Sequence, residues 1–364
     1  MRILYDGSIY KMQVTGGVNR YFQNLIQRLP DCYTPILTTT GISHIGCPQH
    51  SNLKLKCYHR FGLHPGRISY FIEPYYFRWI EGKVHPDLWH PTYYNLLNQR
   101  EISQISRPIV ITVHDTIHEI FADRLDPEGI QAQIKDKAIA AADTILCVSE
   151  NTHQDLLKYY PHAEGKVKVT YLASELHQSL VLGDRTLIEQ PYFLYVGSRW
   201  FYKNVETLLK AFKKVISVYK DIKLCLVSSA FSEQEKRELT ELNLTDYLIL
   251  YDHIDDRTLA QLYHKSIALV YPSLYEGFGL PPLEAMSCGT VAIASNVSSI
   301  PEIVGDAALL FKPTSVDELA DSMIFLLENP LERERLIEKG KQQVKLFSWE
   351  KTVNQTINTY QSLL

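Results

Sequence analysis

Two glutamates with seven residues between them, Glu276 and Glu284, are the strongest candidates for chemistry in this sequence. An apolar run at 267–271 precedes them and predicts a buried strand. Pro281 and Pro282 are typical of a helix start, so we expect Glu276 in the turn and Glu284 in the first helical turn. Glycine backbone lets a ligand approach N–H groups, and a helix N-terminus favours anions. The segment predicts a nucleotide-sugar cradle, although a tight turn with a dipole-stabilising glutamate would use the same residues.

A cationic loop follows another predicted strand. In Val196-Gly-Ser-Arg-Trp-Phe-Tyr-Lys-Asn204 the strand ends in glycine and a helix is expected to begin near Asn204. Between them lie Ser198, Arg199 and Lys203. Arginine binds phosphate bidentately and lysine adds a compact charge, so this loop predicts a diphosphate site that needs no metal. Surface charges on a loop are the alternative.

Weaker signals come from glycine and histidine at other predicted strand ends. Gly16 and Gly17 open a helix after the first strand, where their N–H groups could reach a phosphate or sugar or could simply serve the turn. The full GxGxxG pattern is absent. His114 follows the strand expected at 109–113 and could bond a sugar hydroxyl, or be an ordinary cleft histidine.

No metal site is predicted. Asp252-His-Ile-Asp-Asp256 has ligating residue types but no second cluster at a workable spacing. This segment, with His253 and Ile254, is expected to border a nucleotide-base loop or to cap the following helix.

The elements around these residues alternate between short apolar runs and amphipathic segments. That rhythm predicts an α/β protein with parallel sheets covered by helices on both faces. Because such sheets bind ligands at strand carboxyl ends, we expect two Rossmann-like domains facing an interdomain cleft. Strands are expected at 3–5, 109–113, 144–148, 167–171, 192–196, 223–227, 247–251, 268–271 and 291–294. The expected domains are 1–185 and 186–346, joined by a polar linker at 182–191, with a terminal helix at 347–364 that crosses towards the N-terminal domain.

Composition limits the classes of function. The 364 residues are 45% hydrophobic and 21% charged, which is typical of a globular chain of about two domains. A net charge of −4 argues against nucleic acid as a partner. The sequence contains neither a membrane-spanning apolar run nor a signal-peptide pattern, and its six cysteines form no CxxC pair. We therefore expect a cytoplasmic protein with reduced thiols.

Taken together, these motifs resemble the retaining GT-B glycosyltransferases of family 4, over nearly the whole chain. The most specific part runs from Tyr271 to Gly289, and the first half, with Val113-His-Asp115, is similar to the mannosyltransferase-B branch. The other segments that carry the resemblance are the Gly16-Gly17 loop, Ala142–Ser149, the Arg199 and Lys203 loop, and Phe347–Glu350.

The resemblance implies roles for individual residues. Glu284 would hold the ribose, and Glu276 with the N–H groups of Gly277, Phe278, Gly279 and Leu280 would hold the donor sugar. Arg199 and Lys203 would neutralise the leaving diphosphate, and Gly17 would lie against the phosphate. His253 and Ile254 would contact the base, and His114 the sugar near its reacting carbon. Glu276, His114, Arg199 and Lys203 are thus the expected catalytic residues.

The resemblance also implies a reaction. A hexose, of mannose or glucose type, would move from a GDP- or UDP-linked donor to a glycan or lipid-linked saccharide, with no cofactor or metal. In the front-face mechanism the leaving phosphate oxygen takes the proton of the acceptor hydroxyl, so catalysis rests on charge stabilisation and alignment. One departure is Tyr202, which stands where the phosphate loop often carries a second basic residue.

The acceptor is expected on the N-terminal domain, where residues 58–94 are rich in aromatic side chains interleaved with arginines. Aromatic faces stack on sugars and arginines pair with phosphate, so a polyprenyl-diphosphate-linked saccharide and a peripheral contact with the inner face of a membrane would suit this segment. Core packing of these rings is the alternative. For the whole chain, the alternatives are a nucleotide-sugar epimerase and a non-catalytic nucleotide-sugar-binding partner protein.

Overall fold

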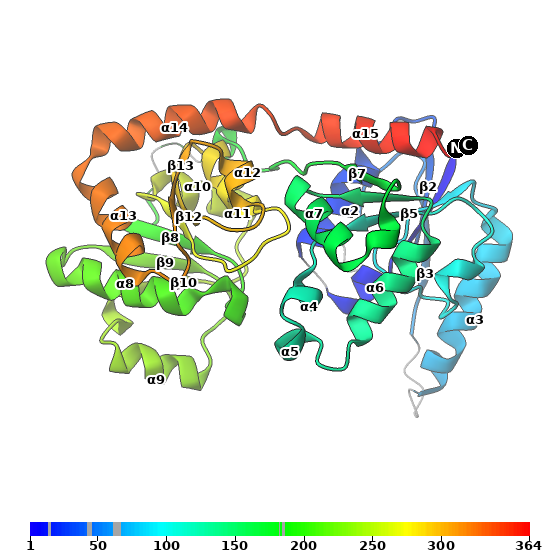
Figure 1. Cartoon of the computed structure of the whole chain (residues 1–364), viewed down its shortest axis with the longest axis horizontal. Helices are drawn as coiled ribbons and strands as arrows, with labels where there is room; N and C mark the ends of the chain where they lie inside the picture. The colour runs from blue at the N-terminus through cyan, green and yellow to red at the C-terminus, as the bar shows by residue number, and fades with distance from the viewer. Residues whose placement is uncertain (14–15, 42–45, 61–66, 182, 184–185) are drawn as a thin grey trace. The chain divides into compact units, whose positions relative to one another are not determined.

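The computed structural model of the chain describes residues 1–13, 16–41, 46–60, 67–181, 183 and 186–364 (Figure 1). The chain forms two compact units. Unit 1 comprises Met1–Leu172 and Trp349–Leu364, and unit 2 comprises Ala173–Ser348. Of the linker expected at 182–191, residues 182, 184 and 185 lie outside the described ranges.

Unit 1 is built on parallel strands. Four of them pair in the order β3-β2-β1-β4 and three in the order β5-β6-β7, and a parallel bridge between Trp89 and Ile109 connects the two sets. The order 3-2-1-4-5-6 of the first six strands is that of a Rossmann fold. The strands are β1 (Arg2–Asp6), β2 (Thr34–Thr40), β3 (Lys54–Tyr58), β4 (Leu88–Trp89), β5 (Val110–Val113), β6 (Thr144–Cys147) and β7 (Val167–Val169).

Helices α2 and α15 of unit 1 each bury an apolar stripe, whereas the short helices α4 and α5 contain no buried residue. In α2 the buried residues Tyr21, Phe22, Leu25 and Ile26 follow helical spacing. The predicted cap of α7 is confirmed, because the Ser149 side chain accepts the Thr152 N–H. The helices are α1 (Ser8–Met12), α2 (Gly17–Gln27), α3 (Arg67–Val84), α4 (Ile117–Ile120), α5 (Ala122–Leu125), α6 (Ile130–Ala141), α7 (Glu150–Tyr159) and α15 (Trp349–Gln361).

Helix α15 is part of the core of unit 1, although it comes from the far end of the chain. The Tyr360 side chain is fully buried, and its hydroxyl lies 3.1 Å from the Tyr5 hydroxyl and 2.6 Å from Nδ1 of His90. Thr352 Oγ1 donates a 2.6 Å hydrogen bond to the Tyr171 carbonyl. These bonds satisfy polar groups in the interior, so the helix is held by a specific network as well as by apolar packing.

Unit 2 has a single six-stranded parallel sheet in the order β10-β9-β8-β11-β12-β13. Relabelled from its own first strand, this is again the order 3-2-1-4-5-6. The predicted fold class, two Rossmann-like α/β domains, is confirmed. The strands are β8 (Tyr192–Val196), β9 (Lys223–Val227), β10 (Leu248–Tyr251), β11 (Leu269–Tyr271), β12 (Ala292–Ser295) and β13 (Ala308–Phe311).

Helices cover both faces of the unit 2 sheet (Figure 1). On one face α8 and α13 share a core with Phe193 and Tyr195 of β8, whose intervening Leu194 points to the other face and is also fully buried. The sheet can therefore offer ligands only its edges and strand ends. The helices are α8 (Val205–Val218), α9 (Glu233–Glu241), α10 (Asp256–Lys265), α11 (Leu280–Ser287), α12 (Ile300–Val304), α13 (Val316–Glu328) and α14 (Pro330–Val344).

Candidate active site

Two of the predicted catalytic residues meet where the strand order of unit 2 reverses, between β8 and β11. Lys203 ends a short 3₁₀ turn after β8, and Glu276 lies in the loop after β11. Lys203 Nζ donates a 2.7 Å hydrogen bond to Glu276 Oε1, and the two side chains are only 16% and 13% exposed. Ligands of open parallel sheets bind outside the strand carboxyl ends at this reversal point. The ion pair therefore lies where a sheet of this kind would bind a ligand.

Two serines that the sequence analysis did not single out hold the backbone of the Glu276 loop. The N–H of Glu276 donates to Ser298 Oγ at 3.0 Å, and Ser299 Oγ is 2.9 Å from the Glu276 carbonyl and 2.8 Å from that of Phe278. Both serines follow β12, which ends at the same edge of the sheet. The sequence contained one sign of this role, since both serines come shortly after a predicted strand.

The loops after β8 and β11 are tied to each other. Asn204 Nδ2 donates to the carbonyls of Pro272, at 3.0 Å, and of Pro313, at 2.7 Å. The Leu274 N–H donates to the Tyr202 carbonyl at 2.7 Å. Asn204 has a left-handed backbone with φ +55°, which asparagine tolerates better than most residues, and α8 begins directly after it, as predicted. These bonds fix the loop that carries Lys203.

Helix α11 begins directly after the loop that carries Glu276. Gly279 precedes the helix with φ +98°, a conformation that favours glycine, and the predicted prolines occupy its first turn. Glu284 is the fifth residue of the helix, so it lies one position beyond the predicted first turn, because the helix already starts at Leu280. Its side chain is buried and accepts a 2.9 Å hydrogen bond from the Tyr263 hydroxyl.

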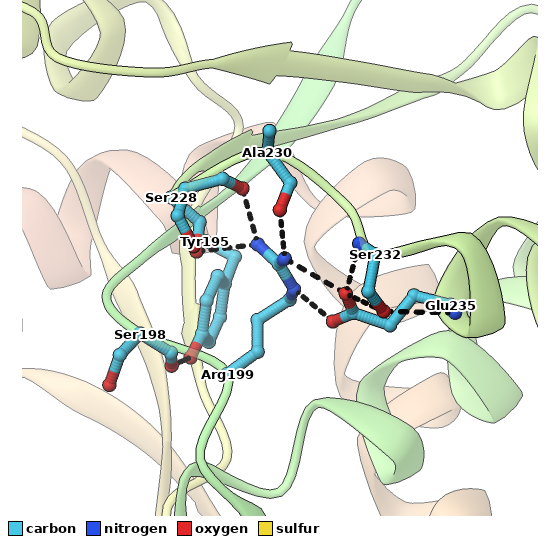
Figure 2. A network of polar contacts seen from close by, with 8 residues as sticks. Tyr195, Ser198, Arg199, Ser228, Ala230, Ser232 and Glu235 are labelled. Atoms are coloured by element: carbon cyan, nitrogen blue, oxygen red, sulfur yellow. Dashed lines mark hydrogen bonds and ion pairs between the residues drawn. The ribbon is translucent and has the colours of Figure 1, made fainter.

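Arg199 is held entirely by protein acceptors (Figure 2). Nε and Nη2 bond the Glu235 carboxylate at 2.6 and 3.2 Å, and the remaining N–H groups bond Ser228 Oγ and the carbonyls of Ser229 and Ala230 at 2.7 to 2.9 Å. These contacts use all five N–H donors of a guanidinium. A diphosphate at Arg199 would have to displace one of them, so its predicted contact with the leaving group stays a prediction.

Glu235 is the anchor of this cluster, and the sequence analysis did not name it. The hydrogen bond from Arg199 lowers the pKa of Glu235 to about 2. Glu235 also completes a capping box with Ser232 at the start of α9. The Ser-x-x-Glu spacing at 232–235 is readable in the sequence as such a box. Next to the cluster, the Tyr195 hydroxyl donates to the Ser198 carbonyl at 2.5 Å, which holds the chain just before Arg199 (Figure 2).

The segment after β10 is more exposed. The side chain of His253 is 89% exposed, and its Nδ1 lies 2.6 Å from Asp252 Oδ1. Ile254 is half-buried. Asp255 caps α10 by accepting the Thr258 N–H at 2.7 Å, so the expected capping role of this segment is confirmed. Within the described ranges, no three His, Cys, Asp or Glu side chains are grouped so that they could hold a metal ion.

The remaining predicted residues belong to unit 1. His114 follows β5, and its ring packs edge-on against Tyr21 at a centroid distance of 5.1 Å. Burial lowers the pKa of His114 to about 4, so the ring is neutral at neutral pH. Its Nε2 is buried, and no hydrogen-bond partner for it exists among the described residues. A buried nitrogen of this kind suits a ligand hydroxyl.

The predicted glycine pair lies at the start of α2. Gly16 precedes the helix and Gly17 is its first residue, whereas Thr15 lies outside the described residues. A Cβ atom added to Gly17 would meet no atom within 4 Å, so the space beside it is open. The backbone at Gly17 is thus open on the side where a Cβ would lie.

Comparison with known proteins assigns both parts of the chain. The family described as glycosyl transferases group 1 matches residues 185–343, and glycosyltransferase family 4 matches residues 15–176. The O-antigen chain mannosyltransferase B of Escherichia coli is 34% identical over 239 residues. That match covers 62% of this chain and 62% of the relative, less than two thirds of its length.

Two solved structures share the whole fold. Sucrose-phosphate synthase from Thermosynechococcus elongatus aligns over 100% of this chain and 98% of its own with a TM-score of 0.81 at 21% identity. Anabaena HepE in complex with UDP-glucose aligns over 100% of both chains with a TM-score of 0.72 at 18% identity. The two family matches leave outside them only residues 1–14, 177–184 and 344–364. Residues 15–176 therefore form a glycosyltransferase family 4 domain and residues 185–343 a glycosyl transferases group 1 domain, in the fold that these two solved structures share.

Proposed function

We propose that the chain transfers a hexose from a nucleotide-diphosphate sugar to a hydroxyl of a glycan or lipid-linked saccharide. The observation that carries this proposal is the Lys203–Glu276 pair at the reversal point of the unit 2 sheet. Mannose has the support of the mannosyltransferase relative, and glucose that of HepE, which was solved with UDP-glucose. Nothing in these matches favours an epimerase or a non-catalytic partner protein.

The Lys203–Glu276 pair suits a site that receives a diphosphate. Before the donor binds, the carboxylate neutralises the ammonium group, and neither side chain is well solvated. Lysine carries three donors, so Lys203 can keep its bond to Glu276 and still bond a phosphate oxygen. Charge on the diphosphate grows as the bond to the sugar breaks, and a fixed cation beside the N-terminus of α11 stabilises that charge.

This arrangement leads us to propose transfer with retention of anomeric configuration and without a metal. Lys203 and the α11 N-terminus supply positive charge at the leaving group, which is the task a metal would otherwise perform. In a front-face reaction the leaving oxygen accepts the proton of the acceptor hydroxyl. Glu276 then acts by orienting the sugar, and His114, held neutral by its surroundings, by contacting a sugar hydroxyl.

The first test is a thermal-shift titration with GDP, UDP, ADP and their sugar conjugates in the presence of EDTA. A ligand that binds only the folded protein raises the midpoint by mass action. We expect one nucleotide series to raise it in the wild type and in Lys210→Ala, an exposed lysine of α8 that pairs with Glu206, but much less in Lys203→Ala.

With the selected donor, NMR of the product would report its anomeric configuration. The proposal fails if no nucleotide shifts the midpoint, or if Lys203→Ala responds like the wild type. Loss of transfer in EDTA that added Mg²⁺ restores would overturn the metal-free mechanism alone.

A further inference from the structure

Helix α3 exposes one apolar stripe to solvent although it also buries apolar side chains, among them Phe77 and Ile80. Its residues Ile68, Phe71, Tyr75 and Trp79, at helical spacing, are 50%, 74%, 66% and 54% exposed. On its inner side it buries Glu73, which is 1% exposed. A surface helix normally buries the apolar stripe and exposes the charges. This helix exposes a second apolar stripe and buries a charge, so its outer face suits an apolar partner better than water.

The polar groups on the inner side of α3 are paired and hydrogen-bonded, so the orientation of the helix is fixed. Lys11 Nζ lies 2.6 Å from one oxygen of the Glu73 carboxylate, and Arg60 Nε lies 3.0 Å from the other. The Tyr58 hydroxyl donates to the Ser69 carbonyl at 3.0 Å. Rotating the helix to bury its apolar stripe would break these buried bonds, which is costly.

The exposed apolar side chains form one patch. We call Ile68, Tyr70, Phe71, Ile72, Tyr75 and Trp79 the α3 face; all six are large, apolar or aromatic, and exposed. No other helix among the described residues exposes more than two such side chains. Patches of this kind on a folded protein mark interaction sites rather than ordinary surface.

Cations lie on the rings of the α3 face. The guanidinium of Arg60 is 4.2 Å from the Tyr70 ring centre and that of Arg78 is 5.2 Å from the Tyr75 ring. Lys83 Nζ is 3.9 Å from the Trp79 ring. Basic groups next to tyrosine and tryptophan rings are the composition of a helix that lies in a lipid headgroup layer.

The two acidic residues of α3 are directed to protein partners instead. Glu73 pairs with Lys11 and Arg60, as described above. Glu81 accepts a 2.9 Å hydrogen bond from Asn98 Nδ2 and lies 3.7 Å from Arg100. The α3 face therefore combines apolar rings with positive charge, which is complementary to an anionic bilayer surface.

We infer that the α3 face docks the protein on an anionic lipid surface. The rings of Phe71, Tyr75 and Trp79 enter the boundary between headgroups and acyl chains, and the neighbouring cations bond lipid phosphates. The inference gives the proposed transfer a surface on which a lipid-linked acceptor would be met, and rests on the proposed function in that respect. Docking itself needs neither donor nor catalysis.

The test is co-sedimentation of the full chain with vesicles of phosphatidylcholine alone or mixed with phosphatidylglycerol. We expect the wild type to sediment with the anionic vesicles and to be released by salt. The double variant Phe71→Glu/Tyr75→Glu should bind at least on the order of tenfold more weakly, since each substitution removes an aromatic ring that would enter the bilayer. The matched control is Phe325→Glu/Leu331→Glu in unit 2, where the side chains are 40% and 80% exposed, and it should bind like the wild type.

A second readout locates the contact. Brominated lipids quench tryptophans that enter the bilayer, and Trp79 and Trp200 are both well exposed. We expect quenching to disappear in Trp79→Phe and to persist in Trp200→Phe. Hydrogen exchange in β1 and α2 of the α3 variant, at the wild-type rate, reports that unit 1 is folded.

Three results would overturn the inference. The wild type could stay in the supernatant with anionic vesicles, or the unit 2 control could lose binding as the α3 variant does. In the third, vesicle binding is absent and the α3 variant has a raised KM for a water-soluble saccharide. That would assign the face, and the groove of ≈ 570 Å³ lined by Tyr70, Phe71, Tyr75 and Arg78, to a saccharide. Failure of the proposed function would show differently, as vesicle binding without any response to nucleotides.

Discussion

At the residue scale, Arg199 raises the question of whether a cation near a phosphate site touches the ligand or builds the site. Its five N–H donors are all bonded to the protein, and Glu235 takes two of them. Only 9% of the side chain is exposed. We therefore regard Arg199 as a positioning residue that joins the loop after β8 to the loop before α9.

This role predicts that Arg199 and Glu235 act as a unit. Arg199→Ala and Glu235→Ala should each weaken nucleotide binding roughly tenfold, because each breaks a partly buried charge-assisted pair. The double variant should be little worse than either single one, since the pair is already broken. Titration calorimetry of the nucleotide found in the thermal-shift screen measures the cycle. Strictly additive losses, or an Arg199 effect without a Glu235 effect, would instead place the guanidinium on the phosphate.

Variants of Lys203 and Glu276 should separate the effect on nucleotide binding from the effect on sugar transfer. Lys203→Ala removes the cation from the leaving group, and we expect turnover to fall by on the order of 10²- to 10³-fold, as when one preorganised donor to a developing charge is lost. Glu276→Gln keeps the shape of the side chain, so we expect near-normal nucleotide binding with a large loss of transfer. Steady-state kinetics with calorimetry of the nucleotide would measure both. Normal turnover in both variants would remove the crevice between β8 and β11 from consideration.

The sequence was informative about some of these residues and silent about others for a physical reason. Lys203 and Glu276 could be predicted because charged residues directly after buried strands of a parallel sheet meet at one edge. The sequence predicted neither the hydrogen bond between them nor the residues that hold the Glu276 loop. Ser298 and Ser299 reach the Glu276 loop through hydrogen bonds across separate loops, and no local pattern specifies such bonds.

At the element scale, the docking of α15 makes unit 1 sensitive to pH. Burial lowers the pKa of His90, which bonds Tyr360 of α15, to about 3 and that of His114 to about 4. Both histidines are neutral in the folded protein, whereas in the unfolded chain they take up protons below about pH 6.5. Their burial therefore lowers the free energy of unfolding progressively as pH falls from 6.5 towards 4. Asp6 acts in the opposite sense. Burial raises its pKa to about 7, so its protonation stabilises the folded protein as pH falls below 7.

We expect the double variant His90→Gln/His114→Gln to lose much of this pH dependence. Each histidine contributes about 1.4 kcal/mol per pH unit below 6.5, so between pH 7.5 and pH 5 the wild type should lose about 4 kcal/mol more than the variant. Urea unfolding followed by unit 1 signals at both pH values measures the difference. His253→Gln, which changes an exposed histidine of unit 2, should keep the wild-type dependence. Equal pH dependence in all three proteins would contradict the buried, neutral state of the two histidines.

Regular elements were predictable where the sequence pattern matches the burial pattern. The strands β8 and β9 and the helices α2 and α8 are such cases. Strands β2 and β3 were not predicted, because Thr34–Thr40 is rich in threonine and Lys54–Tyr58 carries two lysines, so neither forms an apolar run. For α3 the core alternative was right for Phe77 and wrong for rings such as Phe71, since only tertiary contacts decide which face of a helix that is apolar all round is covered.

At the scale of the whole molecule, the two units share one architecture because their sheets have the same strand order. In each unit the first three strands are added outward from the middle of the sheet, and the next three are added on the other side of the first strand. Each unit therefore has one reversal point, between its first and fourth strands. That much follows from the βαβ rhythm of the sequence. The assignment of Trp349–Leu364 to unit 1 depends instead on Tyr360, whose partners Tyr5 and His90 are hundreds of residues away along the chain.

The last prediction concerns this return of the chain to unit 1. Ending the chain at Ser348 removes α15, which leaves the Tyr5 and His90 side chains without their Tyr360 partner and uncovers apolar surface of unit 1. We expect the shortened protein to lose a large part of the stability of unit 1, seen as faster hydrogen exchange in β1 and α2, while unit 2 keeps its response to nucleotide. A chain ended at Gln361, which lacks only the residues after the helix, is the control and should exchange like the full chain. If the chain ended at Ser348 exchanged in unit 1 as slowly as this control, the Tyr5–His90–Tyr360 network would not be what holds the core of unit 1 together.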